Sequence, residues 1–235
     1  MCGRYASFRQ AQDLADAFAI NDVTTAAAAV HPSFNVAPTQ QVRIGLERDE
    51  DAGGQREMHA ARWGLVPPWS EDLSVGSRLI NARSETAAQK RSFAPSVRQR
   101  RCFVPADGYY EWQRGSGRSS TPYFIHRRDA QPMALAGLYA FWRDPSKADD
   151  DPDRWVLTMT ILTRASRGDL AALHHREPVV VGDQLEAWLD PALTDAEEAL
   201  ALLDDDGPPL AHHRVGPEVG NVNNDHEGLI TPVAS

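Results

Sequence analysis

Residues 102–142 read CFVPADGYYEWQRGSGRSSTPYFIHRRDAQPMALAGLYAFW, a run in which one expected strand follows another. The expected strands are Cys102–Pro105, Tyr109–Gln113, Tyr123–His126 and Met133–Trp142. Most are rich in Val, Ile, Tyr, Phe or Trp and are bounded by Gly, Pro or Asp, as strands between turns are. Because no helix is expected between them, the run favours antiparallel pairing over an array of alternating strands and helices.

The flanking sequence adds strands and helices on both sides of this run. Further strands are expected at Gln41–Leu46, Glu57–Trp63 and Trp155–Leu162. No repeat, low-complexity tract or convincing linker divides the chain, so we predict an α+β fold, rich in antiparallel strands, as a single domain over residues 1–235. Helical spacing or capping patterns predict helices from Phe8 to Phe18 with Ser7 as N-cap, from about Ser84 through Lys90, over Gly182–Leu189, and from Thr194 onward.

Composition excludes several classes of protein. The 235 residues are 42% hydrophobic and include 18 aromatic side chains (Trp 6, Tyr 5, Phe 7), which allows a packed core and excludes a disordered chain. No apolar run approaches the roughly 20 residues needed to cross a bilayer, and the first residues lack the apolar core of a signal peptide. Two cysteines do not make a disulfide framework and fit a reducing compartment. We expect a cytoplasmic protein with no membrane partner.

Charge is distributed unevenly along the chain. The net charge of −9, taken alone, argues against a partner as acidic as DNA. Residues 76–130, however, hold ten arginines and Lys90 against four carboxylates, a local net charge of +7 that leaves −16 for the remainder. Two acidic runs, Asp149–Asp153 and Asp204–Asp206, are expected in solvated loops. The basic segment could be an ordinary solvated face or a nucleic-acid surface, and charge alone does not decide between them.

Cys2 is the first residue with distinctive chemistry. Initiator Met is commonly removed before a small residue, and its removal here would leave an α-amine two carbons from a thiol. An α-amine has a pKa of about 8, so much of it is uncharged near neutral pH and can condense with an aldehyde to an imine. The thiol can then close a five-membered thiazolidine ring. Two other interpretations stay open, namely a thiolate nucleophile with its own amine as base, and an incidental Cys at a disordered terminus.

Three further polar residues lie in settings that suit a site. Asn81 is at an expected strand-to-helix junction, Glu111 lies among aromatic residues, and His174 lies at a loop–strand junction. Desolvation would raise the pKa of Glu111 and suit it to acid–base work. Each residue also has an ordinary interpretation, as a solvent-facing Glu or a surface His for example. Cys102 is interpreted as a packing residue. The His and Cys residues show no zinc-ligand spacing, and the phosphate-binding and dinucleotide-binding Gly motifs are missing, so we predict no metal and no cofactor.

Eight segments, in order, make the chain similar to one family, the SOS response-associated peptidases or abasic-site processing proteins that share the SRAP domain. The resemblance covers nearly the whole chain and implies an SRAP-type fold with a barrel-like core and peripheral helices. The segments are Met1–Tyr5, Phe34–Thr39, Arg62–Trp69, Asn81–Glu85, Arg101–Pro105, Gly108–Trp112, Ala136–Tyr139 and His174–Pro178, followed by Val219–Asn221 as a C-terminal match.

The resemblance implies a function and a catalytic set. The implied activity is a thiazolidine crosslink between Cys2 and the aldehyde of an abasic site in single-stranded DNA, after autocatalytic or aminopeptidase removal of Met1. An abasic-site lyase reaction would be a side activity. Asn81 is implied to position Cys2, Glu111 to act as the acid–base group, and His174 to act on the opened sugar oxygen.

The resemblance also implies a DNA-binding set. Arg4 and Arg83 are similar to family positions that contact phosphates near the lesion. Trp63 and Trp69 are similar to positions that wedge or stack on flanking bases. The implied partner is therefore single-stranded DNA containing abasic sites, bound by a monomer that is associated with the nucleoid.

Two departures from the family pattern bear on this site. Glu177 replaces the usual Met of a His-x-Arg-Met-Pro motif, and residues 163–166, Thr-Arg-Ala-Ser, depart from a Thr-Thr-x-Ala-Asn-like pattern. A carboxylate beside His174 is expected to raise the pKa of that histidine or to weaken nearby phosphate binding. The doublet His174-His175 leaves open which ring is the active one.

Two other functions stay open at this point. N-terminal-nucleophile amidotransferases also begin Met-Cys-Gly, although they usually continue with an apolar residue where this chain has Arg4 and Tyr5. A noncatalytic module that binds single-stranded DNA would use the same Arg and Trp residues without a covalent step.

Overall fold

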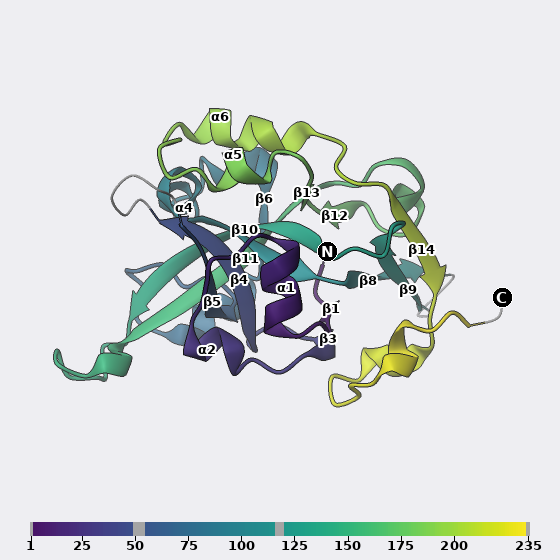
Figure 1. Cartoon of the computed structure of the whole chain (residues 1–235), viewed down its shortest axis with the longest axis horizontal. Coiled ribbons are helices and arrows are strands. Elements are labelled where there is room, and N and C mark those ends of the chain that lie inside the picture. Colours follow the sequence, from purple (N-terminus) through teal and green to yellow (C-terminus); the bar gives the residue numbers. More distant parts are fainter. Residues whose placement is uncertain (1, 49–54, 116–119, 234–235) are drawn as a thin grey trace.

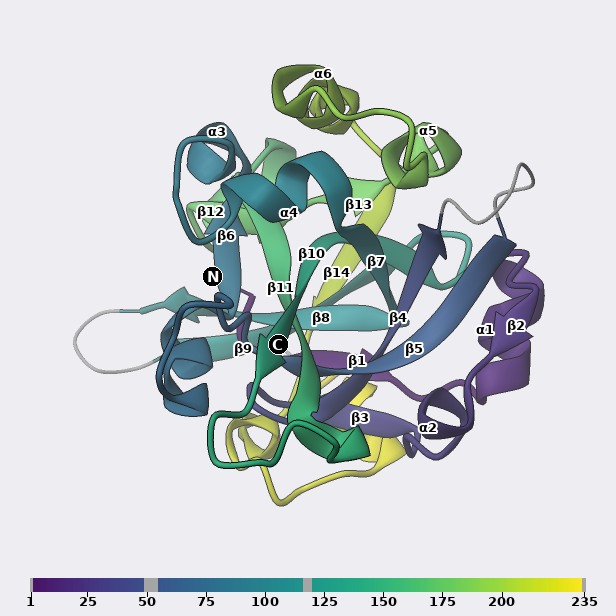
Figure 2. The same ribbon diagram turned by 90° about the vertical axis from the view of Figure 1, so that its left-hand side faces the viewer.

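The computed structural model describes residues 2–48, 55–115 and 120–233. Two β-sheets form its centre, and helices surround them (Figures 1 and 2). The strands are β1 (Tyr5–Ser7), β2 (Asp22–Val23), β3 (Ser33–Val36), β4 (Gln41–Arg48), β5 (Gln55–Trp63), β6 (Asn81–Arg83), β7 (Arg101–Ala106), β8 (Gly108–Arg114), β9 (Ser120–Arg127), β10 (Met133–Arg143), β11 (Trp155–Ala165), β12 (Arg176–Pro178), β13 (Val180–Val181) and β14 (Leu210–Arg214).

The larger sheet closes into a barrel. Its strand order is β12-β11-β10-β7-β4-β5-β2, and β11 pairs with β5 as well, which joins β5, β4, β7, β10 and β11 into a ring. The closing pair is parallel, with Met159 opposite Trp63, and the other four pairs of the ring are antiparallel. The smaller sheet has the order β14-β9-β8-β1-β3. The predicted α+β fold, with an antiparallel-rich, barrel-like core and peripheral helices, is therefore confirmed.

The barrel strands are buried on both faces because each face packs into a different part of the core. On β10, Leu135 and Tyr139 belong to a cluster with Ile44 of β4 and Met159 of β11. The alternate residues of β10 face a second cluster built with helical side chains, as the two-residue period of a strand requires. Those alternate residues are Ala134, Ala136, Leu138 and Ala140, and their helical partners include Leu14, Val97, Trp188 and Ala199.

One glycine is required by the close approach of two barrel strands. Gly45 of β4 lies opposite Phe103 of β7. A Cβ atom at Gly45 would lie 2.1 Å from the Phe103 ring, so any other side chain would displace that ring from the core.

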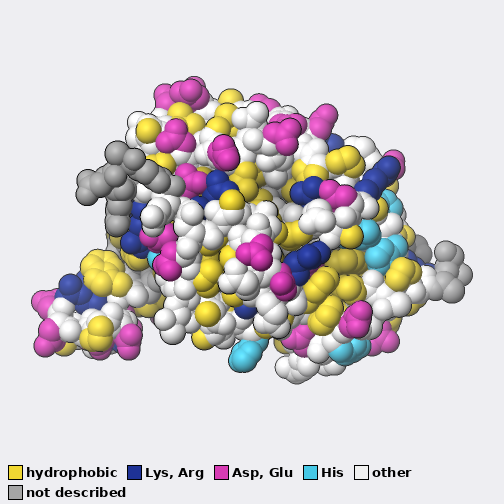
Figure 3. All heavy atoms as spheres, in the orientation of Figure 1, with side chains coloured by type: hydrophobic (Ala, Val, Ile, Leu, Met, Phe, Trp, Pro, Cys, Tyr) yellow, Lys and Arg dark blue, Asp and Glu magenta, His cyan; other side chains and the backbone are white. Residues whose placement is uncertain are grey.

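Helices cover the barrel on two sides. Helices α1 and α2 flank β4 and β5, whereas α3 to α6 lie above the barrel in the view of Figure 2. Exposed acidic side chains gather over α6 at the top of Figure 3, which accounts for part of the negative charge outside residues 76–130. The helices are α1 (Ala11–Ala17), α2 (Thr25–Ala28), α3 (Ser84–Ala87), α4 (Ala94–Gln99), α5 (Leu185–Leu189) and α6 (Ala196–Ala201).

All seven predicted strands are present, but three predicted helix starts are wrong. The helix predicted from Gly182 begins at Leu185, and the helix predicted from Ser84 through Lys90 ends at Ala87. Helix α1 begins at Ala11 with Gln10 as N-cap, because Ser7 belongs to β1 and Phe8 stacks on Phe34 with ring centroids 4.8 Å apart. Helix α6 begins after Asp195 rather than Thr194, since the Asp195 carboxylate accepts the N–H groups of residues 197 and 198 at 2.9 Å.

Short or polar strands were not predicted from the sequence. Strands β1, β2, β3 and β14 are of this kind, whereas β6 and β12 lie at the strand junctions expected beside Asn81 and His174. The acidic run Asp149–Asp153 lies in the β10–β11 connection, which projects at the lower left of Figure 1. In the part of the chain that the structure describes, no helix is long and apolar enough to span a membrane. The single-domain assignment stays a prediction.

Candidate active site

The first strand places the N-terminal residues inside the molecule. Strand β1 lies between β3 and β8, with Tyr5 opposite Tyr109, and the N–H of Tyr110 donates to the carbonyl oxygen of Arg4 at 3.0 Å. This antiparallel direction carries the chain from Arg4 back alongside Glu111. Cys2 is completely buried there, and its thiol lies 4.0 Å from the carbonyl oxygen of Arg4. Met1 lies outside the described residues.

Asn81 reaches Cys2 from the barrel. It begins β6, which runs parallel to β11 with Asn81 opposite Ile161. The Asn81 side-chain amide donates to the carbonyl oxygen of Cys2 at 2.7 Å. Its Oδ1 atom is buried and has no hydrogen-bond partner among the residues that the structure describes. Buried polar atoms are nearly always paired, so this oxygen is placed to accept a hydrogen bond from a group that binds in the site.

Glu111 is a buried carboxyl group next to the terminus. It lies on β8 and is 5% exposed. Burial raises the pKa of Glu111 to about 6, within the range that suits a group exchanging protons near neutral pH. Burial, followed by the negative charge of Glu111, raises the pKa of the Cys2 thiol. The thiol is therefore protonated at neutral pH, which disfavours a thiolate nucleophile as the first step.

His174 shares a small cavity with Glu111. The cavity has a volume of about 10 Å³, about the space that one water molecule requires. The Nδ1 atom of His174 lies 3.0 Å from both the backbone N–H and the carbonyl oxygen of Arg176, so the ring has a partner whether it is neutral or protonated. His175 is exposed and does not line this cavity. His174, rather than His175, is therefore the ring that shares a cavity with Glu111.

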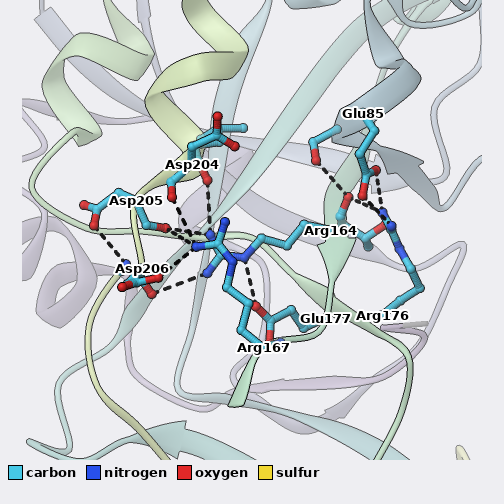
Figure 4. A network of polar contacts seen from close by, with 12 residues as sticks. Glu85, Arg164, Arg167, Arg176, Glu177, Asp204, Asp205 and Asp206 are labelled. Carbon is cyan, nitrogen blue, oxygen red and sulfur yellow. Dashed lines mark hydrogen bonds and ion pairs between the residues drawn. The ribbon is translucent and has the colours of Figure 1, made fainter. Parts of the chain in front are cut away.

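The pKa of His174 is lowered, mainly by burial, and not raised as expected from a neighbouring carboxylate. Glu177 is itself paired, since its carboxylate accepts the Nε–H of Arg164 at 2.8 Å. The separate contribution of Glu177 to His174 stays a prediction. Arg164 is itself the second departure from the family pattern, so the two unusual residues contact each other (Figure 4).

Arg176 is a site residue that was not predicted. It is buried on β12 and forms two hydrogen bonds to the carboxylate of Glu85, at 2.6 and 2.9 Å, and a third to the carbonyl oxygen of Thr163 at 2.5 Å (Figure 4). It thereby ties the His174 loop to the start of α3, which follows β6 and Asn81. The sequence feature that could have identified Arg176 is its position within the His-His-Arg-Glu-Pro motif.

The Arg4 side chain forms hydrogen bonds within the protein that link distant segments of the chain. Its Nη1 atom donates to Asn35 Oδ1 and to the carbonyl oxygen of Val219, both at 2.8 Å. The Asn35 amide donates in turn to the carbonyl oxygens of Asn221 and Asn224. These contacts join the Phe34–Thr39 and Val219–Asn221 motifs to the first residues. A phosphate contact by Arg4 would use its remaining donors.

The two predicted stacking tryptophans differ in exposure. Trp63 is completely buried, packs edge-on against Tyr5 with ring centroids 5.3 Å apart, and donates its indole N–H to the carbonyl oxygen of Ile80. No ring face of Trp63 is open to a base, so the base-stacking role predicted for it is wrong and it packs the core instead. Trp69 is 45% exposed, with the guanidinium carbon of Arg91 4.5 Å from its ring centroid. Arg83 is exposed at the end of β6.

The basic segment is only partly a surface feature. Arg101 is buried, and its guanidinium donates to four backbone carbonyl groups of the helices that flank it. Arg118 lies outside the described residues. Several other arginines of the segment are exposed, namely Arg78, Arg83, Arg91, Arg98, Arg114 and Arg128.

Comparison with known proteins assigns the family. The family model of the SOS response associated peptidases (SRAP) matches residues 1–222. The chain belongs to the SRAP family. This membership places it among proteins associated with the SOS response and DNA damage. It also favours the SRAP interpretation of Met1-Cys2-Gly3 over the amidotransferase one.

Relatives of this SRAP protein match over nearly its full length. The abasic site processing protein YoqW of Bacillus subtilis is 34% identical over 232 residues, covering 98% of this chain and 99% of YoqW. The abasic site processing protein YedK of Escherichia coli is 31% identical over 238 residues, covering 99% and 100% of the two chains. A crystal structure of a Bacteroides thetaiotaomicron protein has a TM-score of 0.82 at 22% identity, covering 99% of this chain and 100% of that one, and shows the same fold.

No metal centre is formed by the described residues, where no group of three or more His, Cys, Asp or Glu side chains could hold an ion.

Proposed function

We propose that this SRAP protein processes abasic sites in single-stranded DNA by forming a thiazolidine between Cys2 and the sugar aldehyde. The observation that carries the proposal is the hydrogen bond from Asn81 to the Cys2 carbonyl oxygen, which fixes the second residue of the chain beside Glu111. A flexible terminus with an incidental Cys would have no need of such a partner. While Met1 is attached, the nitrogen of Cys2 is an amide and cannot attack an aldehyde, so removal of Met1 is the first step.

Ring opening of the abasic sugar is assigned to His174. Opening a cyclic hemiacetal moves one proton from the C1 hydroxyl group to the ring oxygen. Because burial lowers its pKa, His174 is mainly neutral at neutral pH. A neutral imidazole can accept the hydroxyl proton and return it to the ring oxygen, so the step consumes no proton.

Imine formation is assigned to Cys2 and Glu111. The ionised carboxylate accepts a proton from the Cys2 ammonium group, and the resulting amine adds to the aldehyde carbon. Loss of the hydroxyl group as water, with the proton returned by Glu111, leaves an imine. The Cys2 thiol then adds to the imine carbon, which forms the C–S bond, and the thiol proton ends on the nitrogen. Aldehyde and aminothiol thus give thiazolidine and one water molecule. β-Elimination from the imine would be the competing lyase reaction.

Single-stranded DNA is the proposed substrate because Trp69 and Arg83 are the exposed members of the predicted binding set. Stacking on an aromatic ring needs an unpaired base, and an exposed Arg can neutralise a phosphate without reading sequence.

Intact-mass spectrometry tests the proposal. The protein is incubated with single-stranded DNA that carries one abasic site, and the expected species has the mass of the chain without Met1 plus the DNA minus one water. A variant with an uncleavable N-terminal tag is the control, and it is expected to bind DNA without forming the adduct. Absence of any adduct from protein that lacks Met1, or an equal adduct from the tagged protein, would overturn the proposal. The first result would favour a noncatalytic binding module.

A further inference from the structure

An ion pair lies between two strands at the edge of the active-site cavity. Arg164 of β11 and Glu177 of β12 are directly opposite each other in the antiparallel register. The Nε atom of Arg164 lies 2.8 Å from Glu177 Oε1, and the two side chains are 10% and 6% exposed. Directly opposite charges this far from solvent interact much more strongly than a surface pair.

Arg164 is also fixed from its other side. Its Nη1 atom donates to the carbonyl oxygens of Leu203 at 3.1 Å and Asp205 at 2.6 Å, and Nη2 donates to that of Asp206 at 3.3 Å (Figure 4). The acidic run thus binds the arginine through backbone carbonyl groups. The Arg164 guanidinium is thus fixed by Glu177 at Nε and by backbone carbonyl groups at Nη1 and Nη2. It is therefore a rigid counter-charge that orients the Glu177 carboxylate.

Glu177 lines the same cavity as Glu111 and His174. The second oxygen of Glu177 accepts the backbone N–H of Arg167 at 3.3 Å, so neither oxygen depends on a solvent contact. If Arg164 were removed, a buried carboxylate without a counter-charge would lie on this cavity. Besides Arg164, the ionisable groups that line the cavity or act on its members are Cys2, Tyr109, Glu111, Arg114, His174, His175, Arg176 and Glu177.

We propose that Arg164 is a positioning residue that neutralises Glu177 beside the cavity of Glu111 and His174, and thereby sets the pH range over which this site works. The proposal rests on the proposed function for its kinetic test but not for its spectroscopic one. An uncompensated Glu177 carboxylate would disfavour ionisation of Glu111 and favour protonation of His174. An Arg164 guanidinium without its carboxylate partner would favour ionisation of Glu111 and disfavour protonation of His174.

A double-mutant cycle separates this role from simple packing. The variants are Arg164→Gln, Glu177→Gln and the double variant, and the measurement is the pH dependence of the crosslinking rate on abasic single-stranded DNA. We expect the midpoint of the rate profile to rise by about one pH unit in Arg164→Gln and to fall in Glu177→Gln. The double variant, which lacks both charges, is expected to return to within a few tenths of a unit of the wild-type midpoint.

Arg167→Gln is the matched control. Arg167 is a neighbouring arginine whose guanidinium also binds the Asp204–Asp206 run, at 3.0 to 3.1 Å, but only its backbone N–H contacts Glu177. The variant keeps that N–H, so its midpoint is expected to match the wild type.

The second readout is the NMR titration of His174 in the free protein, with His174→Gln used to assign its signal. The pKa of His174 is expected to rise in Arg164→Gln and to fall in Glu177→Gln, whether or not a crosslink ever forms. If the wild type forms no adduct, the proposed function fails while this titration still tests the pair. Unchanged His174 titration in both single variants, with rates lowered equally at every pH, would overturn the proposal. If Arg164→Gln does not fold, Glu177→Gln and the double variant carry the test.

Discussion

The side-chain amide of Asn81 donates to the carbonyl oxygen of Cys2 at 2.7 Å, across 79 residues of sequence. The bond fixes the peptide group that follows the reactive amine and thiol. Together with the burial of Cys2, this contact fixes the proposed nucleophile relative to Glu111.

Replacing Asn81 tests that relationship. Asn81→Ala is expected to slow crosslinking about tenfold, because a hydrogen bond of this kind is worth about 1–3 kcal/mol when its partner is left buried. Rates on abasic single-stranded DNA measure the effect. Ser84→Ala is the control, since Ser84 follows the same strand and its hydroxyl donates to Thr163 rather than Cys2. Equal slowing in both variants would point to a general disturbance of β6.

The Cys2→Ala variant distinguishes the contribution of the α-amine to the adduct from that of the thiol. Alanine also permits removal of Met1 and leaves an α-amine, so an imine with the abasic aldehyde should still form and be trapped by borohydride. The stable adduct should be lost because no thiol can close the ring. Gel mobility under denaturing conditions measures both species. Cys102→Ala removes the other, buried thiol and should leave the adduct intact. A stable adduct in Cys2→Ala without borohydride would exclude the thiazolidine.

The crosslinking rate should rise with pH through the pKa of Glu111. Burial raises that pKa to about 6, and the ionised carboxylate is the form that accepts a proton from the Cys2 ammonium group. Glu111→Gln should lose this rise and slow the reaction by about 100-fold, the usual contribution of a general base. Rates from pH 5 to 8 are the measurement. If the pH dependence of the crosslinking rate were unchanged in Glu111→Gln, the rise in rate would belong to the titration of another group.

The same carboxyl group should make the fold less stable as pH rises. Its pKa is raised from an ordinary value of 4.5 to about 6 in the folded state, so folding favours the protonated form. The stabilisation is complete below the unfolded pKa and is lost as pH rises through 6, a loss of about 2 kcal/mol. Chemical denaturation of Glu111→Gln, which stays neutral, should not show this loss. A loss as large in the variant would contradict the assignment.

Trp69 and Trp63 should respond to substitution in opposite ways. Trp69→Ala is expected to weaken binding of single-stranded DNA by about 1–3 kcal/mol, the worth of one stacked base, with little change in stability. Trp63→Ala should lower the free energy of unfolding by about 3–5 kcal/mol, because Trp63 fills the core. Fluorescence anisotropy and thermal unfolding measure the two effects. Normal DNA affinity in Trp69→Ala would remove Trp69 from the interface.

Arg83→Ala should weaken DNA capture and flatten its salt dependence. One lost phosphate contact lowers the slope of log affinity against log salt by about 0.7 on a single strand. Titrations at several salt concentrations measure the slope. Arg143 is the control, because it is exposed in the projecting β10–β11 hairpin and pairs with Asp149. Equal slopes for the two variants would exclude a specific contact by Arg83.

The regular strands were predictable because their β-branched and aromatic residues and the Gly, Pro or Asp residues that bound them are local signals. The barrel closure was not, since the parallel pairing of β5 with β11 joins Trp63 to Met159 through contacts distant in sequence. Helix α6 was misplaced by one residue because Thr194 and Asp195 are both good caps, and only the observed hydrogen bonds choose between them.

Within the site, the residue types were predictable but their surroundings were not. The aromatic neighbours of Glu111 in the sequence suggested its burial but left a solvent-facing position open, and the structure shows that it is buried. The burial of Trp63 did not follow, since a Trp between Arg62 and Gly64 has no pattern that distinguishes packing from stacking. The pairing of Arg164 with Glu177 depends on the register of β11 with β12, which no local pattern specifies.

Strand β1 precedes the other described strands in the chain, yet it is an inner strand of its sheet, with β3 on one side and β8 on the other. Its partner Tyr109 is synthesised long after Tyr5, so the sheet cannot close around the terminus until about half of the chain exists. Asn81 and Glu111 are made within the same interval. Cys2, the proposed nucleophile, therefore reaches its place beside Asn81 and Glu111 only after those residues have been synthesised, so we expect its chemistry to begin only in a chain that has folded.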